Sequence, residues 1–217
     1  MASKKIKKQD IQSAYIDYVL TEGKEPSSVY AFAKANKMTE GDFYDHFSSF
    51  EAIEIGIWAH GIDTAIEQIK KQEVWNEYSA RERILSFFYT YFEVLRNNRS
   101  FIKYSMKACG PMPPGKTPAR LKPVKDTFLA FCTDVLGEGL ESGELTDRKG
   151  LNRRYKDVLW LEFLFVLDFW IKDNSKGFEK TDEAIEKGVN VIFDFIGRNP
   201  IDSLVEYGKF LFQNASK

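Results

Sequence analysis

The chain has 217 residues with 31 basic and 32 acidic side chains, so its formal net charge is -1. This balance excludes a general electrostatic attraction to nucleic acid or anionic membrane, and a hydrophobic content of 43% excludes a disordered chain. The two cysteines, Cys109 and Cys132, are too few for a disulfide scaffold and form no CxxC pair, which is typical of a reduced, cytoplasmic protein.

No targeting or membrane segment is expected. The basic start MASKKIKKQD leads into no apolar stretch of the kind a signal peptide needs. The most apolar run, LWLEFLFVLDFWI, is interrupted by Glu162 and Asp168 and is shorter than the roughly 18 residues of a membrane span. We therefore expect a soluble protein.

Apolar residues recur at three- and four-residue steps along nearly the whole chain, which predicts an all-α fold. The first helix is marked by Ile11, Tyr15, Tyr18 and Val19, and it ends near Gly23. The second covers residues 29–36 with Ser27 or Ser28 as N-cap, and the third follows the N-cap Thr39 and runs to about residue 47. The fourth is capped by Ser48 or Ser49 and reaches about residue 72, and further helices are expected at residues 80–97, 100–108, 120–142, 151–172, 182–196 and 201–213.

The second and third helices form a helix-turn-helix. They are joined by a tight turn at Lys37 and Met38 and are supported by the first helix. Apolar side chains fall where a small three-helix core needs them, for example at Phe32, Phe43 and Phe47. In a helix-turn-helix the second helix of the pair lies in the major groove of DNA.

The stretch SSVYAFAKANKMTEGDFYDHFSSFEAI resembles the DNA-binding domain of the TetR family of bacterial regulators. Members of that family typically read TSVRDIAKRAGVSKGTLYHYFGSKEEL here, and no gap is needed. The motif covers about residues 8–55, and the remainder resembles the family in its architecture, including the ESGEL turn. The resemblance implies a three-helix DNA-binding domain in residues 1–50 and a helical ligand-binding and dimerisation domain in residues 51–217.

The resemblance also implies particular contacts with DNA. Tyr44 matches a tyrosine whose hydroxyl typically touches a phosphate, Lys34 matches a lysine of the second helix, and Ser28 matches a hydroxyl that caps that helix. A basic N-terminal arm could grip the backbone or the minor groove. The candidate DNA-binding residues are Lys4, Lys5, Lys7, Lys8, Ser28, Lys34, Thr39, Gly41, Asp42, Tyr44 and His46.

The expected recognition helix departs from the family in its charge. It carries Glu40, Asp42 and Asp45 and has no lysine or arginine, while residues 1–60 hold nine acids and seven bases. Because affinity for DNA comes mainly from neutralising phosphates, this charge opposes binding. Two interpretations stay open. The protein binds DNA weakly with help from the lysine arm, or it is a TetR-fold lipid- or small-molecule-binding protein that has lost DNA binding, with residues 201–213 as an amphipathic terminal helix.

The C-terminal part is rich in aromatic residues at helical spacing, which is typical either of an apolar ligand cavity or of a close-packed core. We expect them to line a cavity for an apolar or aromatic small-molecule effector. The candidate lining residues are Phe87, Phe88, Tyr91, Phe92, Tyr104, Phe128, Phe131, Trp160 and Phe163.

The helix at residues 151–172 is apolar all round, which is typical of a helix at the centre of a bundle or of one that meets a partner subunit. The resemblance to the TetR family implies that residues 151–172 and 182–196 form a four-helix bundle across a homodimer. Glu162 is the exception in that helix. It either faces solvent at the edge of the bundle, which we favour, or is buried with a raised pKa or a partner.

Other motifs carry little weight. GPMPPGKT, residues 110–117, fits the spacing of a phosphate-binding loop, but its three prolines offer no backbone N–H and a helix, not a strand, precedes it. The two histidines, His46 and His60, have no second ligand at metal spacing. We expect no metal, no cofactor and no enzymatic activity.

Overall fold

The computed structural model describes residues 6–110, 116–148 and 151–197. Within these residues the chain is built of helices and short connections, and it holds no β-strand beyond an isolated bridge between Leu145 and Gly197. The prediction of an all-α protein is confirmed. None of the helices in the described ranges is long and apolar enough to cross a membrane.

The chain packs as two compact units. The first joins Met1–Glu67 to Tyr91–Thr127, and the second joins Gln68–Thr90 to Phe128–Lys217. This division follows packing, and the functional boundary expected at residue 50 stays a prediction.

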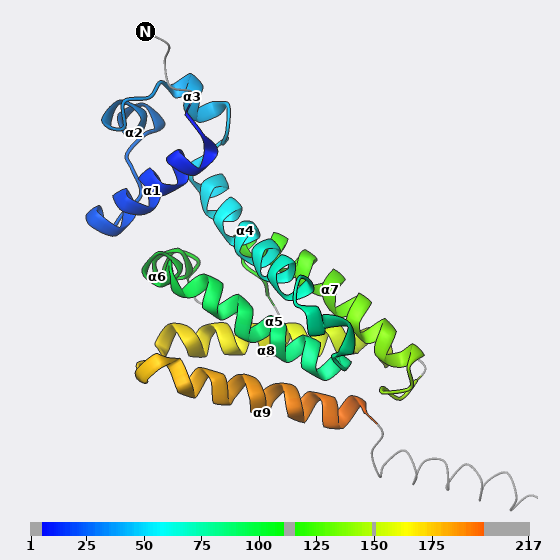
Figure 1. Ribbon diagram of the computed structural model, residues 1–217. Helices are drawn as coiled ribbons and strands as arrows, with labels where there is room; N and C mark the ends of the chain where they lie inside the picture. The colour runs from blue at the N-terminus through cyan, green and yellow to red at the C-terminus, as the bar shows by residue number, and fades with distance from the viewer. Residues whose placement is uncertain (1–5, 111–115, 149–150, 198–217) are drawn as a thin grey trace, which may run out of the picture. The chain divides into compact units, whose positions relative to one another are not determined.

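The first unit contains the helix-turn-helix and the helices packed around it (Figure 1). Three of the helices named here, α4, α5 and α7, continue into the second unit. The elements are α1 (Lys8–Glu22), α2 (Val29–Ala35), α3 (Glu40–Tyr44), α4 (Phe50–Lys70), α5 (Ala80–Arg96), α6 (Arg99–Ala108), the 3-10 helix η2 (Ala119–Leu121) and α7 (Lys122–Glu141).

Local chemistry explains the ends of the first helices. α1 ends at Gly23, whose φ of 68° lies in the left-handed region that glycine adopts without strain. The turn between α2 and α3 places Lys37 at a φ of 56°. α3 ends at Tyr44 rather than near residue 47, although the backbone N–H of Phe47 still donates to the carbonyl oxygen of Phe43 at 2.9 Å.

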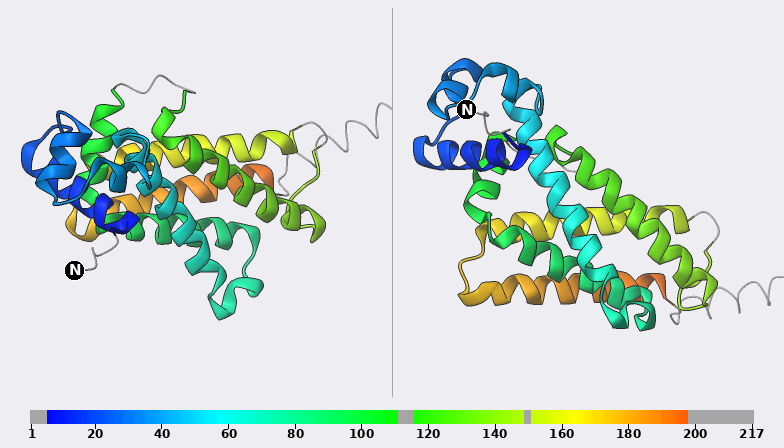
Figure 2. Two further views of the ribbon diagram at one scale, coloured as in Figure 1. Left: turned by 90° about the horizontal axis from the view of Figure 1, so that it is seen from above. Right: turned by 45° about the horizontal axis from the view of Figure 1, so that its top comes forward.

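The second unit contains an aromatic core and a pair of long helices, α8 and α9, which run side by side (Figures 1 and 2). α9 begins three residues before the predicted residue 182, and two short 3-10 helices were not predicted because they follow no apolar repeat. The predicted helix at 201–213 lies outside the described residues. The elements not yet named are η1 (Glu73–Glu77), α8 (Asn152–Lys172), η3 (Lys176–Phe178) and α9 (Glu179–Ile196).

Candidate nucleic-acid interface and aromatic core

The two helices of the helix-turn-helix are both held by side-chain N-caps. The backbone N–H of Ala31 donates to Ser28 Oγ at 3.1 Å at the start of α2. At the start of α3 the backbone N–H of Asp42 donates to Thr39 Oγ1 at 3.1 Å. The caps satisfy N–H groups that have no partner within their own helix, so both short helices begin at fixed residues.

Asp42 takes part in the cap of the recognition helix. Its Oδ2 accepts the backbone N–H of Thr39 at 2.8 Å and the hydroxyl of the same residue at 2.7 Å. These hydrogen bonds from Thr39 lower the pKa of Asp42 below its ordinary value. The carboxylate therefore closes a capping box at the positive end of the helix. The resemblance to the TetR family did not predict this role for Asp42.

The recognition helix is anchored by one buried ring. Phe43 lies 6.1 Å from Phe32 and 5.5 Å from Phe50 between ring centroids, and all three rings are buried. Tyr15 of α1 stacks on Phe50 at 5.4 Å and closes this core. With Phe43 pointing inward, the outer side of α3 is left to its polar residues and to Tyr44.

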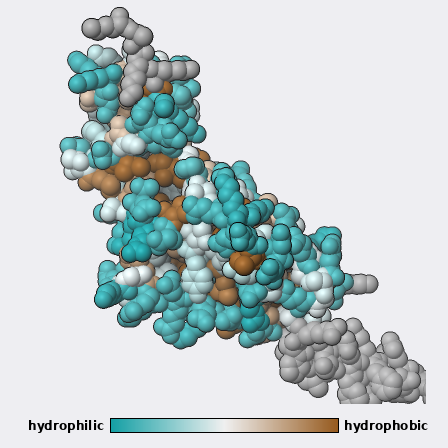
Figure 3. Space-filling view, viewed as in Figure 1, coloured by the Kyte–Doolittle hydropathy of each residue, from teal (hydrophilic) through white to brown (hydrophobic). Residues whose placement is uncertain are grey.

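The exposed side of the helix-turn-helix carries several of the predicted DNA contacts. Tyr44 is 55% exposed and Tyr30 is 59% exposed. Lys34 is exposed beside Tyr30, with its Nζ 5.9 Å from the ring centroid. Thr39 and Gly41 are also exposed. In the face seen in Figure 3 this part of the molecule is mainly hydrophilic.

The predicted basic arm is described only in part. Lys7 and Lys8 are exposed at the start of α1, and Lys8 Nζ lies 5.5 Å from the centroid of the Phe47 ring. Lys4 and Lys5 lie outside the described residues. His46 is half-buried, and its Nε2 is 3.0 Å from the carbonyl oxygen of Ile6, so this ring holds the segment that leads into α1.

The predicted ligand-lining residues divide between the two units. One buried cluster in the second unit is formed by Phe87, Phe88, Phe128, Phe131, Trp160 and Phe163. Ring centroids within it are 5.2 Å apart for Phe128 and Phe163 and 4.9 Å for Trp160 and Phe163. The remaining candidates belong to the first unit, and they are Tyr91, Phe92 and Tyr104.

A hollow of about 680 Å³ opens beside this cluster on the second unit. Phe131 belongs to the hollow and to the aromatic cluster, because it lines the hollow and its ring centroid lies 5.1 Å from that of Phe87. Trp75 stands opposite at 6.2 Å from Phe131. The other lining residues are Lys70, Thr133, Asp134, Val135, Gly137, Glu138 and Glu141.

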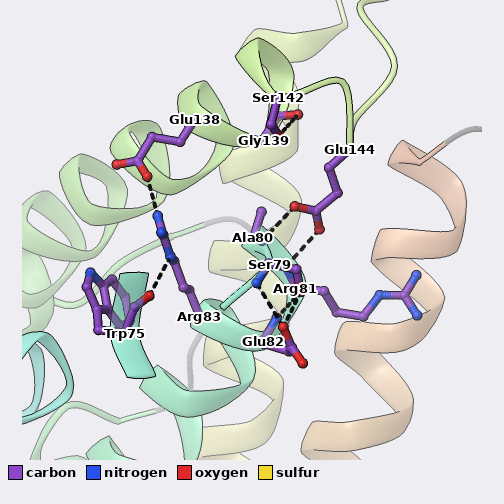
Figure 4. Close-up of polar contacts among 10 residues, drawn as sticks. All are labelled: Trp75, Ser79, Ala80, Arg81, Glu82, Arg83, Glu138, Gly139, Ser142 and Glu144. Atoms are coloured by element: carbon purple, nitrogen blue, oxygen red, sulfur yellow. Dashed lines mark hydrogen bonds and ion pairs between the residues drawn. The ribbon is translucent and has the colours of Figure 1, made fainter. Parts of the chain in front are cut away.

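Arg83 contacts two residues that line the hollow, Trp75 and Glu138, as Figure 4 shows. Its guanidinium lies 5.0 Å from the centroid of the Trp75 ring, and its Nε–H donates to the Trp75 carbonyl at 3.3 Å. The same guanidinium pairs with Glu138 of α7. A planar cation thus ties η1 to α7, and no sequence pattern indicated it because Arg83 and Glu138 are far apart in the chain.

The ESGEL turn has a structural role in the same region. Glu144 accepts the backbone N–H of Ala80 at 2.7 Å and that of Arg81 at 3.3 Å, and so caps the start of α5 (Figure 4). Ser79 and Glu82 add a capping box at the same helix end, with the N–H of Ser79 donating to Glu82 at 2.8 Å. The turn therefore positions the helix that carries Phe87 and Phe88.

Comparison with known proteins decides the family. Residues 83–211, more than half of the chain, match the model of the tetracyclin repressor-like C-terminal domain. The chain belongs to the TetR family of transcriptional regulators. No curated protein matches the sequence.

Solved structures of TetR-family proteins share the fold. A putative TetR family regulator from Shewanella sp. PV-4 is 14% identical, with a TM-score of 0.58 over 89% of this chain and 100% of the other. The fatty acid degradation regulator FadR from Bacillus halodurans is 16% identical, with a TM-score of 0.57 over 88% and 96%. PfmR from Thermus thermophilus is 18% identical, with a TM-score of 0.53 over 88% and 97%.

In this TetR-family chain, α8 and α9 expose a set of large apolar side chains. Phe165 of α8 is 56% exposed and Phe195 of α9 is 66% exposed. The other exposed members of this apolar face are Leu151, directly before α8, Val158 and Leu161 of α8, and Val191 of α9. An exposed patch of this kind marks an interaction surface.

Glu162 stands among these apolar residues and is half-buried, whereas we had favoured a carboxylate facing solvent. Its Oε1 is buried without a hydrogen-bond partner in the described part of the chain. It packs against Gly188 so closely that a Cβ at Gly188 would lie 2.0 Å from Oε1. Burial raises the pKa of Glu162. The sequence could not decide this, because the missing Cβ at Gly188 is what admits the carboxylate.

No cluster of three or more His, Cys, Asp or Glu side chains that could hold a metal ion occurs within the described ranges.

Proposed function

We propose that this TetR-family protein is a one-component regulator that acts in the cytoplasm, binding DNA through its helix-turn-helix and an apolar or aromatic small molecule through its C-terminal helices. The observation that carries the proposal is the recognition helix α3, which is capped at Thr39, anchored by Phe43 and exposed at Tyr44. This arrangement suits insertion into a major groove. Enzymatic activity is no part of the proposal.

The exposed hydroxyls and amines are the proposed contacts with the DNA backbone. The Tyr44 hydroxyl would donate to a phosphate, and Ser28 and Lys34 would meet the backbone from α2. The basic arm contains four lysines, Lys4, Lys5, Lys7 and Lys8. They are four of the seven basic residues in residues 1–60. Because each neutralised phosphate releases counterions, binding through these groups should weaken steeply with salt.

A second copy of the chain is the proposed occupant of the apolar face on α8 and α9. Six large apolar side chains exposed together suit burial against an identical surface, as in a two-fold symmetric dimer. A dimer would present two recognition helices to a palindromic operator, in which the spacing of the half-sites matches that of the helices.

The hollow beside Phe131 is the proposed entrance for the effector. Trp75 and Phe131 offer aromatic surface, and Phe131 leads inward to the ring cluster of Phe87 and Phe128. A ligand that enters there would have to move rings that now contact one another. If it favours one of two arrangements of the helices, it shifts the population and with it the fit to DNA.

The test of DNA binding is selection from a pool of random duplexes by the full-length protein. Enrichment of a palindromic sequence is expected, and Tyr44→Phe should weaken the selected complex while leaving the fold intact. Deletion of residues 4–8 should weaken it further. Tyr89→Phe, which removes an exposed hydroxyl in the second unit, is the matched control.

The second candidate is a TetR-fold binding protein without DNA. The observation in its favour is that Glu40 and Asp45 are exposed on and beside α3 and would face phosphates. No enriched sequence, together with no binding to a random duplex at low ionic strength, would establish this alternative. Quenching of tryptophan fluorescence by an apolar aromatic dye, lost in Trp75→Phe but kept in Trp170→Phe, would then show that the small-molecule site remains.

A further inference from the structure

One buried carboxylate joins the helix-turn-helix to the helices behind it within the first unit. Glu54 of α4 is 1% exposed, and the hydroxyl of Tyr15, on α1, donates to its Oε1 at 2.8 Å. Tyr15 is itself fully buried, and its ring stacks on Phe50 beneath the recognition helix. The carboxylate therefore holds the residue on which the core of the helix-turn-helix rests.

The second oxygen of Glu54 is held from two further elements. The hydroxyl of Ser105, on α6, donates to Oε2 at 2.6 Å, and Ser105 accepts the indole N–H of Trp58 at 3.1 Å. Arg120 of η2 forms an ion pair with the same oxygen, with its Nε 2.8 Å away. Four elements, α1, α4, α6 and η2, thus meet at one side chain.

Arg120 is the cation that makes this burial tolerable. A carboxylate removed from water is costly unless it is paired and hydrogen-bonded. Two other titratable groups that interact with Glu54 supply no positive charge. Glu25 is an acid whose pKa is raised by partial burial and by Glu54, and Tyr104 is a phenol whose pKa is raised by the same two causes.

The hydroxyl of Tyr15 keeps its proton and donates a hydrogen bond to Glu54. Burial, followed by the charge of Glu54, raises the pKa of its hydroxyl far above the ordinary range. The hydrogen bond between α1 and α4 therefore depends on a charged or at least accepting side chain at residue 54. Loss of Arg120 would leave that charge unpaired and would favour its escape toward water, away from Tyr15.

We propose that Glu54, held by Arg120, is the positioning residue that fixes α1 and the recognition helix for DNA binding. The proposal rests on the proposed function, since it concerns how well the helix-turn-helix is placed for DNA. Through Arg120 the network also connects the helix-turn-helix to η2. This short helix leads directly into α7, which carries Phe128 and Phe131.

The first readout needs no DNA. Hydrogen–deuterium exchange of the full-length protein should show faster exchange in α1 for Arg120→Gln than for wild type. Arg81→Gln is the matched control, because it also removes an arginine from a carboxylate, Asp194, but in the second unit and outside the hollow. It should leave α1 unchanged.

The second readout is affinity for the duplex that the wild-type protein selects from a random pool. Arg120→Gln should weaken binding by about tenfold or more, while Arg81→Gln should change it little. Adding Glu54→Gln to Arg120→Gln should recover much of the loss, because a neutral amide still accepts the Tyr15 hydroxyl and needs no cation. Tyr15→Phe should not be rescued in this way.

The outcomes separate the two proposals. If the wild type selects no DNA, the proposed function fails, and exchange in α1 still decides the role of Glu54. Unchanged exchange in α1 for Arg120→Gln would overturn the inference. So would a loss of DNA binding that Glu54→Gln fails to rescue when circular dichroism shows both variants folded.

Discussion

Thr39 and Asp42 cap the recognition helix reciprocally: the backbone N–H of Asp42 donates to the Thr39 hydroxyl oxygen, and the backbone N–H and hydroxyl of Thr39 donate to the Asp42 carboxylate. One of the acids whose charge opposes DNA binding thus has a structural task. Glu40 has no such task, since it is exposed and forms no ion pair among the described residues.

The two acids should therefore respond differently to substitution. Glu40→Lys should strengthen binding to DNA and steepen its salt dependence by about 0.9 in the logarithmic slope, since it adds one phosphate contact. Asp42→Thr also removes a negative charge but loses the carboxylate half of the capping box, so we expect a smaller gain in affinity and a lower melting temperature. Fluorescence anisotropy over a salt series measures the first effect and thermal unfolding the second.

Glu73→Lys is the control for Glu40→Lys, because Glu73 is an exposed acid at the start of η1 in the second unit. An equal gain from Glu73→Lys would show that net charge alone, and not the position of Glu40 on α3, determines the affinity.

Asp173 should make stability depend on pH in acid. Burial alone would raise its pKa, but hydrogen bonds from Thr181 and Ser175 outweigh it and lower the pKa to about 2. The folded state then binds fewer protons than the unfolded state, so this stabilisation is present above about pH 4 and is lost as the pH falls toward 2. Asp173→Asn should remove much of that dependence and should lower the free energy of unfolding at neutral pH by about 1–3 kcal/mol.

Denaturant unfolding at neutral and acid pH measures this change. Asp168→Asn is the matched substitution at the same end of α8, where the carboxylate pairs with Lys172 near solvent. It should cost less than about 1 kcal/mol. Equal costs for the two variants would refute a special role for Asp173.

The apolar face on α8 and α9 should hold a dimer. Phe165→Glu would place a charge on that surface, so we expect it to yield monomers at concentrations at which the wild type is dimeric. Light scattering measures the mass. Val74→Glu, at an exposed apolar residue of η1, should leave the dimer intact. A monomeric wild type at micromolar concentration would contradict the proposed dimer.

Glu162 should oppose stability as pH rises. Burial raises its pKa above the ordinary 4.5, so the folded state binds more protons than the unfolded state. The free energy of unfolding should therefore fall as the pH rises from 4.5 through the raised pKa of Glu162. Glu162→Gln should remove this decline and raise the free energy of unfolding at neutral pH, by no more than about 1 kcal/mol because solvent screens a half-buried charge. Chemical denaturation across this pH range is the measurement, with the exposed Glu186→Gln as control. A pH profile identical to that of the wild type would show that Glu162 is ionised without cost.

The sequence alone determined the features that depend on neighbours along the chain. Helix periodicity, the caps at Ser28 and Thr39, the end of α1 at Gly23 and the helix-turn-helix pattern all arise within a few residues, so the all-α class and the TetR-like start could be predicted. The predicted end of α3 and the predicted start of α9 were less accurate, because the directions of the adjoining helices decide where these helices end and begin.

Only the tertiary structure decided which distant residues meet. Tyr15, Glu54, Ser105 and Arg120 share a buried network although they come from distant parts of the chain, and no local pattern indicates that they meet. The aromatic candidates looked alike in sequence, yet packing divides them between two units and adds Trp75 to the lining of the hollow. Helical spacing predicts which residues share a face of a helix, but three-dimensional packing decides what that face contacts. Whether a buried charge is tolerated likewise depends on a cation from elsewhere in the chain.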